Sequence, residues 1–158
     1  MPSMPTKKLL PKVQITLVLH DLLETLGFEA EEFSRYFASW KALGPGGENA
    51  DYYFGKDGYY NKPLRGGKLV VRHVHLPPEG GTDLVIWDQA AERRTRKTSD
   101  TALIYAHDHH HGFLLIDIVI EPNGHLIATM ATPESIEMMN LYADVAEAFI
   151  HNGTVLLI

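Results

Sequence analysis

The chain of 158 residues has the size of one domain, and its 45% hydrophobic and 22% charged residues predict a globular protein with a substantial core. It contains no cysteine, which excludes disulfides, zinc-binding cysteine motifs and a cysteine nucleophile. The net charge of −6 argues against a general nucleic-acid binder, although basic residues gather locally.

The amino-terminal region does not predict a secretion signal. A short apolar run follows two lysines, but Pro11 and Lys12 interrupt it and no small-residue cleavage site follows. No stretch reaches the roughly 20 apolar residues that a membrane span needs. We therefore expect a cytoplasmic protein that avoids membranes, with a single domain over residues 1–158 and a loose lead-in at residues 1–12.

The first half of the chain begins with an ambiguous segment. Residues 13–26 fit helical spacing, while residues 13–18 alone fit a strand. Aromatic residues then recur at helical spacing over residues 33–40, and a glycine-rich run ends the pattern. Residues 44–67 are rich in glycine, proline and asparagine and predict a loop.

The next segments predict strands. Residues 68–76 alternate so that His73 and His75 share one face and Arg72 lies on the other. Residues 84–87 predict a second, short strand, and a basic run follows it.

Residues 97–120 predict the hairpin around which the fold is organised. Two apolar runs flank a tight polar turn, and the second run is apolar on both faces except at Asp117. This pattern is typical of a strand covered on both sides. The polar segment from Lys97 to Asp100 leads directly into the hairpin, so we expect any chemistry near this rigid base.

The carboxy-terminal region predicts one long helix. Residues 121–124 are a turn signal, and Thr132 caps a helix that runs over residues 133–151 and ends before Gly153. Residues 155–158 predict a short edge strand. Together these elements predict an α+β fold, in which amino-terminal helices pack on an antiparallel sheet that a carboxy-terminal helix closes.

Histidine is the most conspicuous functional residue type, with nine in the chain. His73 and His75 project from one strand face and can bind a metal or share acid and base roles, unless one is simply buried and the other exposed. The spacing Gly67-x5-His73-x-His75-x3-Glu79 resembles the first metal motif of cupins, which gives a metal-dependent enzyme as an alternative. The glycine expected at Ile86 is missing, and the second cupin motif is incomplete.

The histidines at the hairpin turn, residues 107–111, form a candidate metal-binding tract. Consecutive side chains at a mobile tip do not converge on one ion with fixed geometry. We therefore favour a solvated turn for this tract.

The polar entry to the hairpin suggests RNA chemistry. Cleavage of RNA without a metal needs a base for the ribose 2′-hydroxyl, cations for the transition state and an acid for the leaving oxygen. The candidate catalytic residues are His73, His75, Lys97, Asp100, Tyr105 and His125. The candidate phosphate-binding residues are Arg72, Arg93, Arg94, Arg96, Lys97 and Thr98. In the alternative, Thr98 and Asp100 cap a turn and Tyr105 packs in the core.

The motifs FGKDGYY, HVHL, KTSDTALIY, LLIDIVIEPNGH and AEAF, in this order, resemble the YafO-type toxins of bacterial toxin–antitoxin systems. The resemblance covers residues of about 30–151. The matching positions are Phe54, Gly55, Asp57, Tyr60, His73, His75, Leu76, Lys97, Thr98, Asp100, Leu103, Tyr105, Pro122 and His125. The family often has Arg-Thr-Asn-Asp where this chain has Lys-Thr-Ser-Asp, and residues 82–94 look like an insertion.

The resemblance implies a ribosome-dependent mRNA endonuclease that arrests growth and is silenced by a cognate antitoxin. From the residue types we expect its acid and base chemistry to need no metal or cofactor. The resemblance implies the ribosome and mRNA as further partners, with DNA reached only through the antitoxin complex. It also implies a compact RelE-like form of the α+β fold. The catalytic residues above remain inferred from residue types. A non-catalytic inhibitory binding module is a further alternative.

Overall fold

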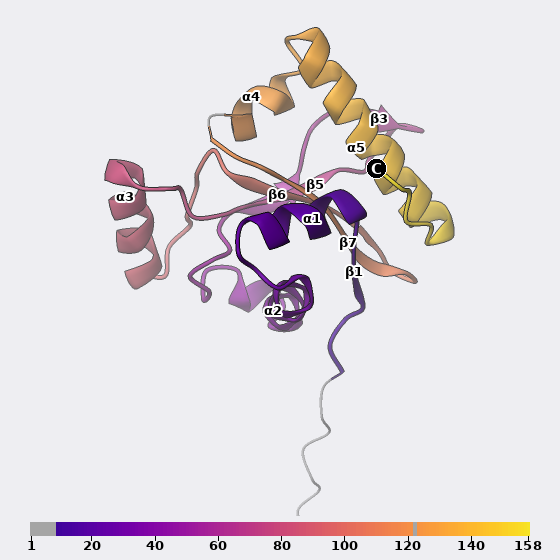
Figure 1. Cartoon of the computed structure of the whole chain (residues 1–158). Coiled ribbons are helices and arrows are strands. Elements are labelled where there is room, and N and C mark those ends of the chain that lie inside the picture. The colour runs from indigo at the N-terminus through magenta and orange to yellow at the C-terminus, as the bar shows by residue number, and fades with distance from the viewer. Residues whose placement is uncertain (1–8, 122) are drawn as a thin grey trace, which may run out of the picture.

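The computed structural model describes residues 9–121 and 123–158, which form an α+β fold around a mixed sheet (Figure 1). The strands are β1 (Val13–Ile15), β2 (Asp57–Tyr59), β3 (Leu64–Arg65), β4 (Lys68–Leu69), β5 (Arg72–His75), β6 (Ala102–Asp108) and β7 (Gly112–Val119). The helices are α1 (Leu17–Thr25), α2 (Ala30–Ala42), α3 (Gly81–Glu92), α4 (Asn123–Thr129) and α5 (Pro133–Asn152), with a 3-10 turn at Pro45–Gly47.

The main sheet has the strand order β1-β7-β6-β5-β2, and β3 pairs with β4 in a separate small sheet. The prediction of an antiparallel sheet is corrected at one edge, because β1 runs parallel to β7 while the other pairs are antiparallel. The predicted hairpin is confirmed as β6 and β7. Both are interior strands, which explains why their residues are apolar on both faces.

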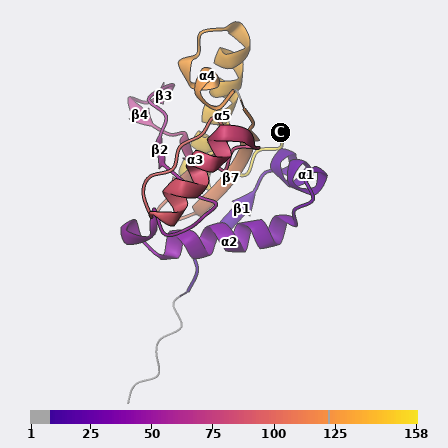
Figure 2. The same cartoon turned by 90° about the vertical axis from the view of Figure 1, so that its left-hand side faces the viewer.

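Helices cover both faces of the sheet, as Figures 1 and 2 show. On one face, Leu103 and Leu115 pack with residues of α1 and α2 such as Phe37. On the other face, Ile104 and Ile116 pack with residues of α4 and α5. These two faces are called the α2 face and the α5 face below.

Both interpretations of residues 13–26 are partly right. The segment forms β1 and then, at Thr16, turns into α1. The Thr16 hydroxyl caps the helix by accepting from the Leu19 N–H (3.3 Å) and donates to the Ile116 carbonyl (2.6 Å). The aromatic helix over residues 33–40 is confirmed within α2, and residues 44–67 contain β2 and β3 as well as loops.

The strand predicted at residues 84–87 is wrong, because these residues lie in α3. A short apolar run has no period that separates strand from helix. In α3 only Trp87 is buried, while Val85 and Ile86 are 54% and 57% exposed. Figure 1 shows α3 beside the sheet, away from α4 and α5.

Two carboxy-terminal predictions are also corrected. The turn expected at residues 121–124 gives way to α4, which begins at Asn123, and residues 155–158 form no strand. The long helix is confirmed as α5, with Thr132 and Ser135 forming its capping box and Gly153 ending it at a φ of 67°.

Most of the lead-in predicted at residues 1–12 lies outside the described residues. Residues 9–12 form neither helix nor strand, and the Lys12 carbonyl already accepts from the Phe113 N–H at 2.9 Å. In the described part of the chain, no helix combines the length and apolarity that crossing a membrane requires.

Candidate active site

Three imidazoles meet on the α5 face of the sheet. His73 and His75 project from β5 onto this face, because their pairing partners Ile104 and Ala102 belong to it. Their ring centres are 5.4 Å apart. His125 comes from α4, and its ring centre is 5.6 Å from that of His75. These rings and Asp100 are called the histidine cluster below.

The pairing of His125 with Asp100 depends on a close approach of two backbone segments. The Gly124 N–H donates to the Asp100 carbonyl at 2.8 Å. A Cβ at residue 124 would lie 2.0 Å from that carbonyl oxygen, so only glycine allows this approach. The Asp100 carboxylate then contacts Nδ1 of His125. The Tyr60 hydroxyl also holds α4 in place, since it donates to the Gly124 carbonyl at 3.2 Å.

His75 is fixed as a neutral hydrogen-bond donor. The ring is 4% exposed, and its Nδ1 accepts from the Ser99 N–H at 2.9 Å. Burial first and the neighbouring His125 second lower the pKa of His75 to about 4. At neutral pH the proton of this ring therefore lies on Nε2.

His73 is neutral at pH 7 for a similar reason. Burial first and His75 second lower its pKa to about 4. The ring stacks on Tyr60, with centres 3.8 Å apart and planes 2° apart. Its buried Nδ1 has no hydrogen-bond partner in the described part of the chain.

Lys56 is a member of the site that the sequence analysis did not select. Its carbonyl accepts from the His75 N–H at 2.9 Å, and its own N–H donates to the Lys97 carbonyl at 2.8 Å. The exposed side chain adds to the lowering of both histidine pKa values. The sequence signal for Lys56 was the FGKDGYY motif, in which it follows Gly55. Gly55 packs so closely against the Lys97 backbone that a Cβ would lie 2.4 Å from the Lys97 carbonyl oxygen.

A second polar cluster occupies the α2 face. Lys41 donates to Asp57 at 2.5 Å, the Tyr105 hydroxyl also bonds Asp57, and Arg72 lies 4.3 Å from the centre of the Tyr59 ring. Burial lowers the pKa of Lys41 and raises that of Tyr105. Lys41, Asp57, Arg72 and Tyr105 are called the Asp57 cluster below.

The structure thus divides the residues selected from the sequence. His73, His75, Asp100 and His125 come together, whereas Tyr105 and Arg72 lie on the opposite face of the sheet. Arg93, Arg94, Arg96 and Thr98 are exposed near or after the end of α3.

Lys97 is placed differently from its neighbours. Its backbone joins the strand network beside His75, but its side chain is only 1% exposed and its Nζ lies 5.7 Å from the Trp87 ring centre. No described residue forms a hydrogen bond with this Nζ, and burial lowers its pKa.

The metal triad of the cupin alternative does not assemble. Among residues 9–121 and 123–158, the acidic and histidine side chains close enough to share an ion are those of His20, Asp21 and Glu24 on α1. Glu79 does not join His73 and His75, and the mixed sheet is not a jelly roll.

Comparison with known families places this geometry in context. The family model described as "Toxin YafO, type II toxin-antitoxin system" matches residues 38–151, which include every member of the histidine cluster. The chain belongs to the YafO toxin family. Membership in a type II system implies a toxin role and a cognate antitoxin. No curated protein and no solved structure gives a significant match to this YafO-family chain, and the RelE-like form of the fold stays a prediction.

Proposed function

We propose that this YafO-family toxin is a ribosome-dependent mRNA endonuclease and that the histidine cluster carries out the cleavage. The supporting observation is the convergence of three imidazoles and a carboxylate from β5, α4 and the entry to the hairpin. In the proposed reaction the ribose 2′-hydroxyl attacks phosphorus, and the bond to the 5′-oxygen breaks to leave a 2′,3′-cyclic phosphate.

His125 is the proposed general base. Asp100 contacts Nδ1, which favours the tautomer with the proton on that nitrogen and leaves Nε2 free to accept the proton of the 2′-hydroxyl. The carboxylate also stabilises the imidazolium that forms. The side chain of His125 is 65% exposed, so a bound RNA strand can reach it.

The buried histidines act on the phosphate. The Nε2–H of neutral His75 donates to a non-bridging oxygen as negative charge develops there. A bound phosphate raises the pKa of His73, because an anion stabilises the charged ring. Protonated His73 then supplies the proton that the leaving 5′-oxygen takes.

In this proposal exposed cations bind the RNA backbone, and Lys56 is the one beside the cluster. Lys56 lies beside both buried histidines, and the exposed Arg93, Arg94, Arg96 and Thr98 extend the contact along the strand. The net charge of −6 does not prevent such binding, since the ribosome holds and positions the mRNA. Lys97, Arg72 and Tyr105 make no direct RNA contact in this scheme.

The test is expression of the chain in a bacterium, followed by mapping of mRNA 5′ ends by primer extension. Growth should stop, and cleavage should require translation and persist in a reconstituted system when the purified toxin has first been stripped of bound metal by a chelator that is then removed. A folded His75→Ala variant should lower the rate of cleavage by about 10²-fold, whereas His20→Ala, on α1, should leave it unchanged. Normal growth with folded wild-type protein would contradict the proposal, and equal cleavage of ribosome-free RNA would contradict its ribosome dependence.

A further inference from the structure

An apolar groove of about 570 Å³ lies at the junction of α1, α2 and the ends of the central strands. Its lining includes Leu26, Phe28, Phe33, Tyr36, Tyr53 and Ile118. Leu26, Phe28 and Tyr53 are 45%, 51% and 50% exposed, so much apolar surface faces solvent at this one place. Large exposed apolar patches of this kind mark interaction sites on protein surfaces.

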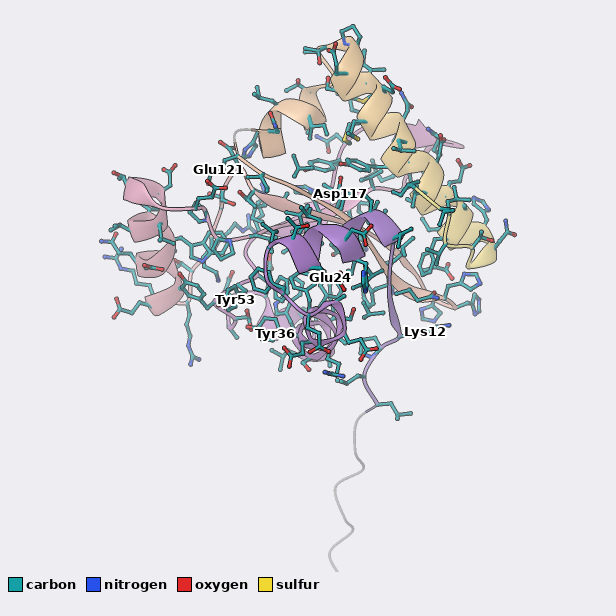
Figure 3. The ribbon with its side chains drawn as sticks, in the orientation of Figure 1. Lys12, Glu24, Tyr36, Tyr53, Asp117 and Glu121 are labelled. Carbon is teal, nitrogen blue, oxygen red and sulfur yellow. The ribbon has the colours of Figure 1, made fainter. Side chains whose placement is uncertain are left out.

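The groove is held open by a rigid floor. Phe54 is fully buried and stacks on Trp40 and Tyr36, with ring centres 4.5 and 5.5 Å apart. Tyr36 in turn meets the edge of Tyr53 and is anchored by a hydrogen bond to Asp51. Figure 3 shows Tyr36 and Tyr53 beside each other below α1. A preformed surface of this kind binds without first having to order itself.

The charged residues at the groove are all acidic. Glu29, Glu32 and Glu79 line it, and no lysine or arginine does so among the described residues. Figure 3 shows Glu24 on α1 above the two tyrosines. An acidic rim around an apolar floor is complementary to apolar side chains flanked by lysine or arginine.

We propose that this groove binds an amphipathic segment of the cognate antitoxin, with its apolar side chains on the floor and its basic side chains on the acidic rim. A helix with apolar residues at i, i+3 or i+4 and i+7 presents such a stripe. The inference rests on the antitoxin partner of the proposed function and is independent of the nuclease chemistry.

In this proposal the bound segment anchors the antitoxin and does not itself cover the histidine cluster. Thr101 lines the groove and directly follows Asp100 of the histidine cluster. The groove itself lies on the α2 face, since Leu23, Phe33 and Phe54 line it, so a segment bound here leaves the histidine cluster on the opposite face open. In this proposal the rest of the antitoxin blocks the approach of the ribosome.

The experiment measures binding of the purified chain to the protein encoded by the adjoining reading frame, by titration calorimetry at several salt concentrations. Glu32→Lys should raise the Kd at least tenfold and flatten the salt dependence. Glu31→Lys is the matched control, because Glu31 lies in the same first turn of α2 but not in the groove. Leu26→Lys should weaken binding similarly, whereas the exposed Leu43→Lys, at the far end of α2, should not.

Equal effects of Glu32→Lys and Glu31→Lys, or no effect of either, would overturn the proposal. So would a wild-type dimer in sedimentation that Leu26→Lys dissociates, because a second copy would then occupy the groove. Failure of the nuclease proposal is recognised separately, since binding is measured without RNA. If both proposals hold, the Glu32→Lys variant arrests growth even when the antitoxin is co-expressed.

Discussion

The histidine cluster and the Asp57 cluster lie on opposite faces of the same sheet and differ in how exposed their paired side chains are. Lys41 and Asp57 are 16% and 15% exposed, whereas His125 and Asp100 are 65% and 46% exposed. In the Asp57 cluster, the Asp57 carboxylate accepts hydrogen bonds from both Lys41 and Tyr105. The Lys41 Nζ also lies 4.6 Å from the Trp40 ring centre. In the histidine cluster, burial keeps two rings neutral, and a third ring remains exposed beside its carboxylate.

The comparison teaches that residue type alone does not separate a site from a structural network. Charged and polar candidates lie on both faces, but on the α2 face Lys41 and Tyr105 are both bound to Asp57, and Nε of Arg72 has no hydrogen-bond partner among the described residues. Acid and base chemistry needs groups that can still exchange a proton with a substrate. We therefore assign catalysis to the α5 face and stability to the α2 face, and the following predictions test that division.

The largest effect is expected for His125→Ala. Loss of a general base lowers the rate of mRNA cleavage by about 10³-fold, equivalent to about 4 kcal/mol of transition-state stabilisation. Because His125 is exposed, the free energy of unfolding should change by less than about 0.5 kcal/mol. The rate is measured on stalled ribosome complexes, with His110→Ala as the exposed-histidine control. A rate within threefold of wild type would remove His125 from the mechanism.

The next effect concerns stability alone. Asp57→Ala leaves Lys41 and Tyr105 without their shared acceptor, and should lower the free energy of unfolding by about 3 kcal/mol. Urea denaturation measures the change. The control is Asp88→Ala, which removes only an exposed contact to Tyr52. Similar stability of both variants would mean that the Asp57 cluster does not hold the sheet and α2 together.

A smaller effect is expected in the pH dependence of stability. The pKa of His75 is about 4 in the folded chain, below its ordinary value of 6.5, so only the unfolded chain takes up this proton between pH 6.5 and 4. Stability from this group is therefore present above pH 6.5 and is lost as the pH falls to 4. His75→Gln should remove about 2 kcal/mol of the acid-induced loss of unfolding free energy. Parallel pH profiles for wild type and this variant, with His20→Gln as control, would refute the assignment.

The smallest effect is expected for Tyr60→Phe. The variant keeps the stack on His73 but loses the hydrogen bond to the Gly124 carbonyl, at a cost of about 1 kcal/mol in unfolding free energy. Cleavage should fall less than threefold, since α4 is also held by the contact between Gly124 and Asp100. A drop of a hundredfold would instead give the Tyr60 hydroxyl a direct role in catalysis.

The sequence was informative where one local pattern decided the structure. Alternating and apolar residues predicted β6 and β7, a capping threonine and a glycine bounded α5, and alternation along β5 put His73 and His75 on one face. The same alternation placed Arg72 opposite them. Each of these features depends on neighbours within a few residues.

The remaining features depend on contacts between distant segments. A register shift in the β6–β7 pairing between Ile104 and Tyr105 sets which residues Tyr105 faces, and no local pattern reveals it. Lys97 is buried because Trp87 of α3 covers it, and α3 itself was not predicted. Asp100 meets His125 only because α4 begins where a turn was expected.

The most direct test compares His125→Ala with Tyr105→Phe, as folded proteins, in one assay of mRNA cleavage on translating ribosomes. Our assignment predicts a loss of about 10³-fold for His125→Ala and a rate within threefold of wild type for Tyr105→Phe, whose cost is confined to stability. Full activity of His125→Ala together with an inactive, folded Tyr105→Phe would contradict the assignment of catalysis to the α5 face.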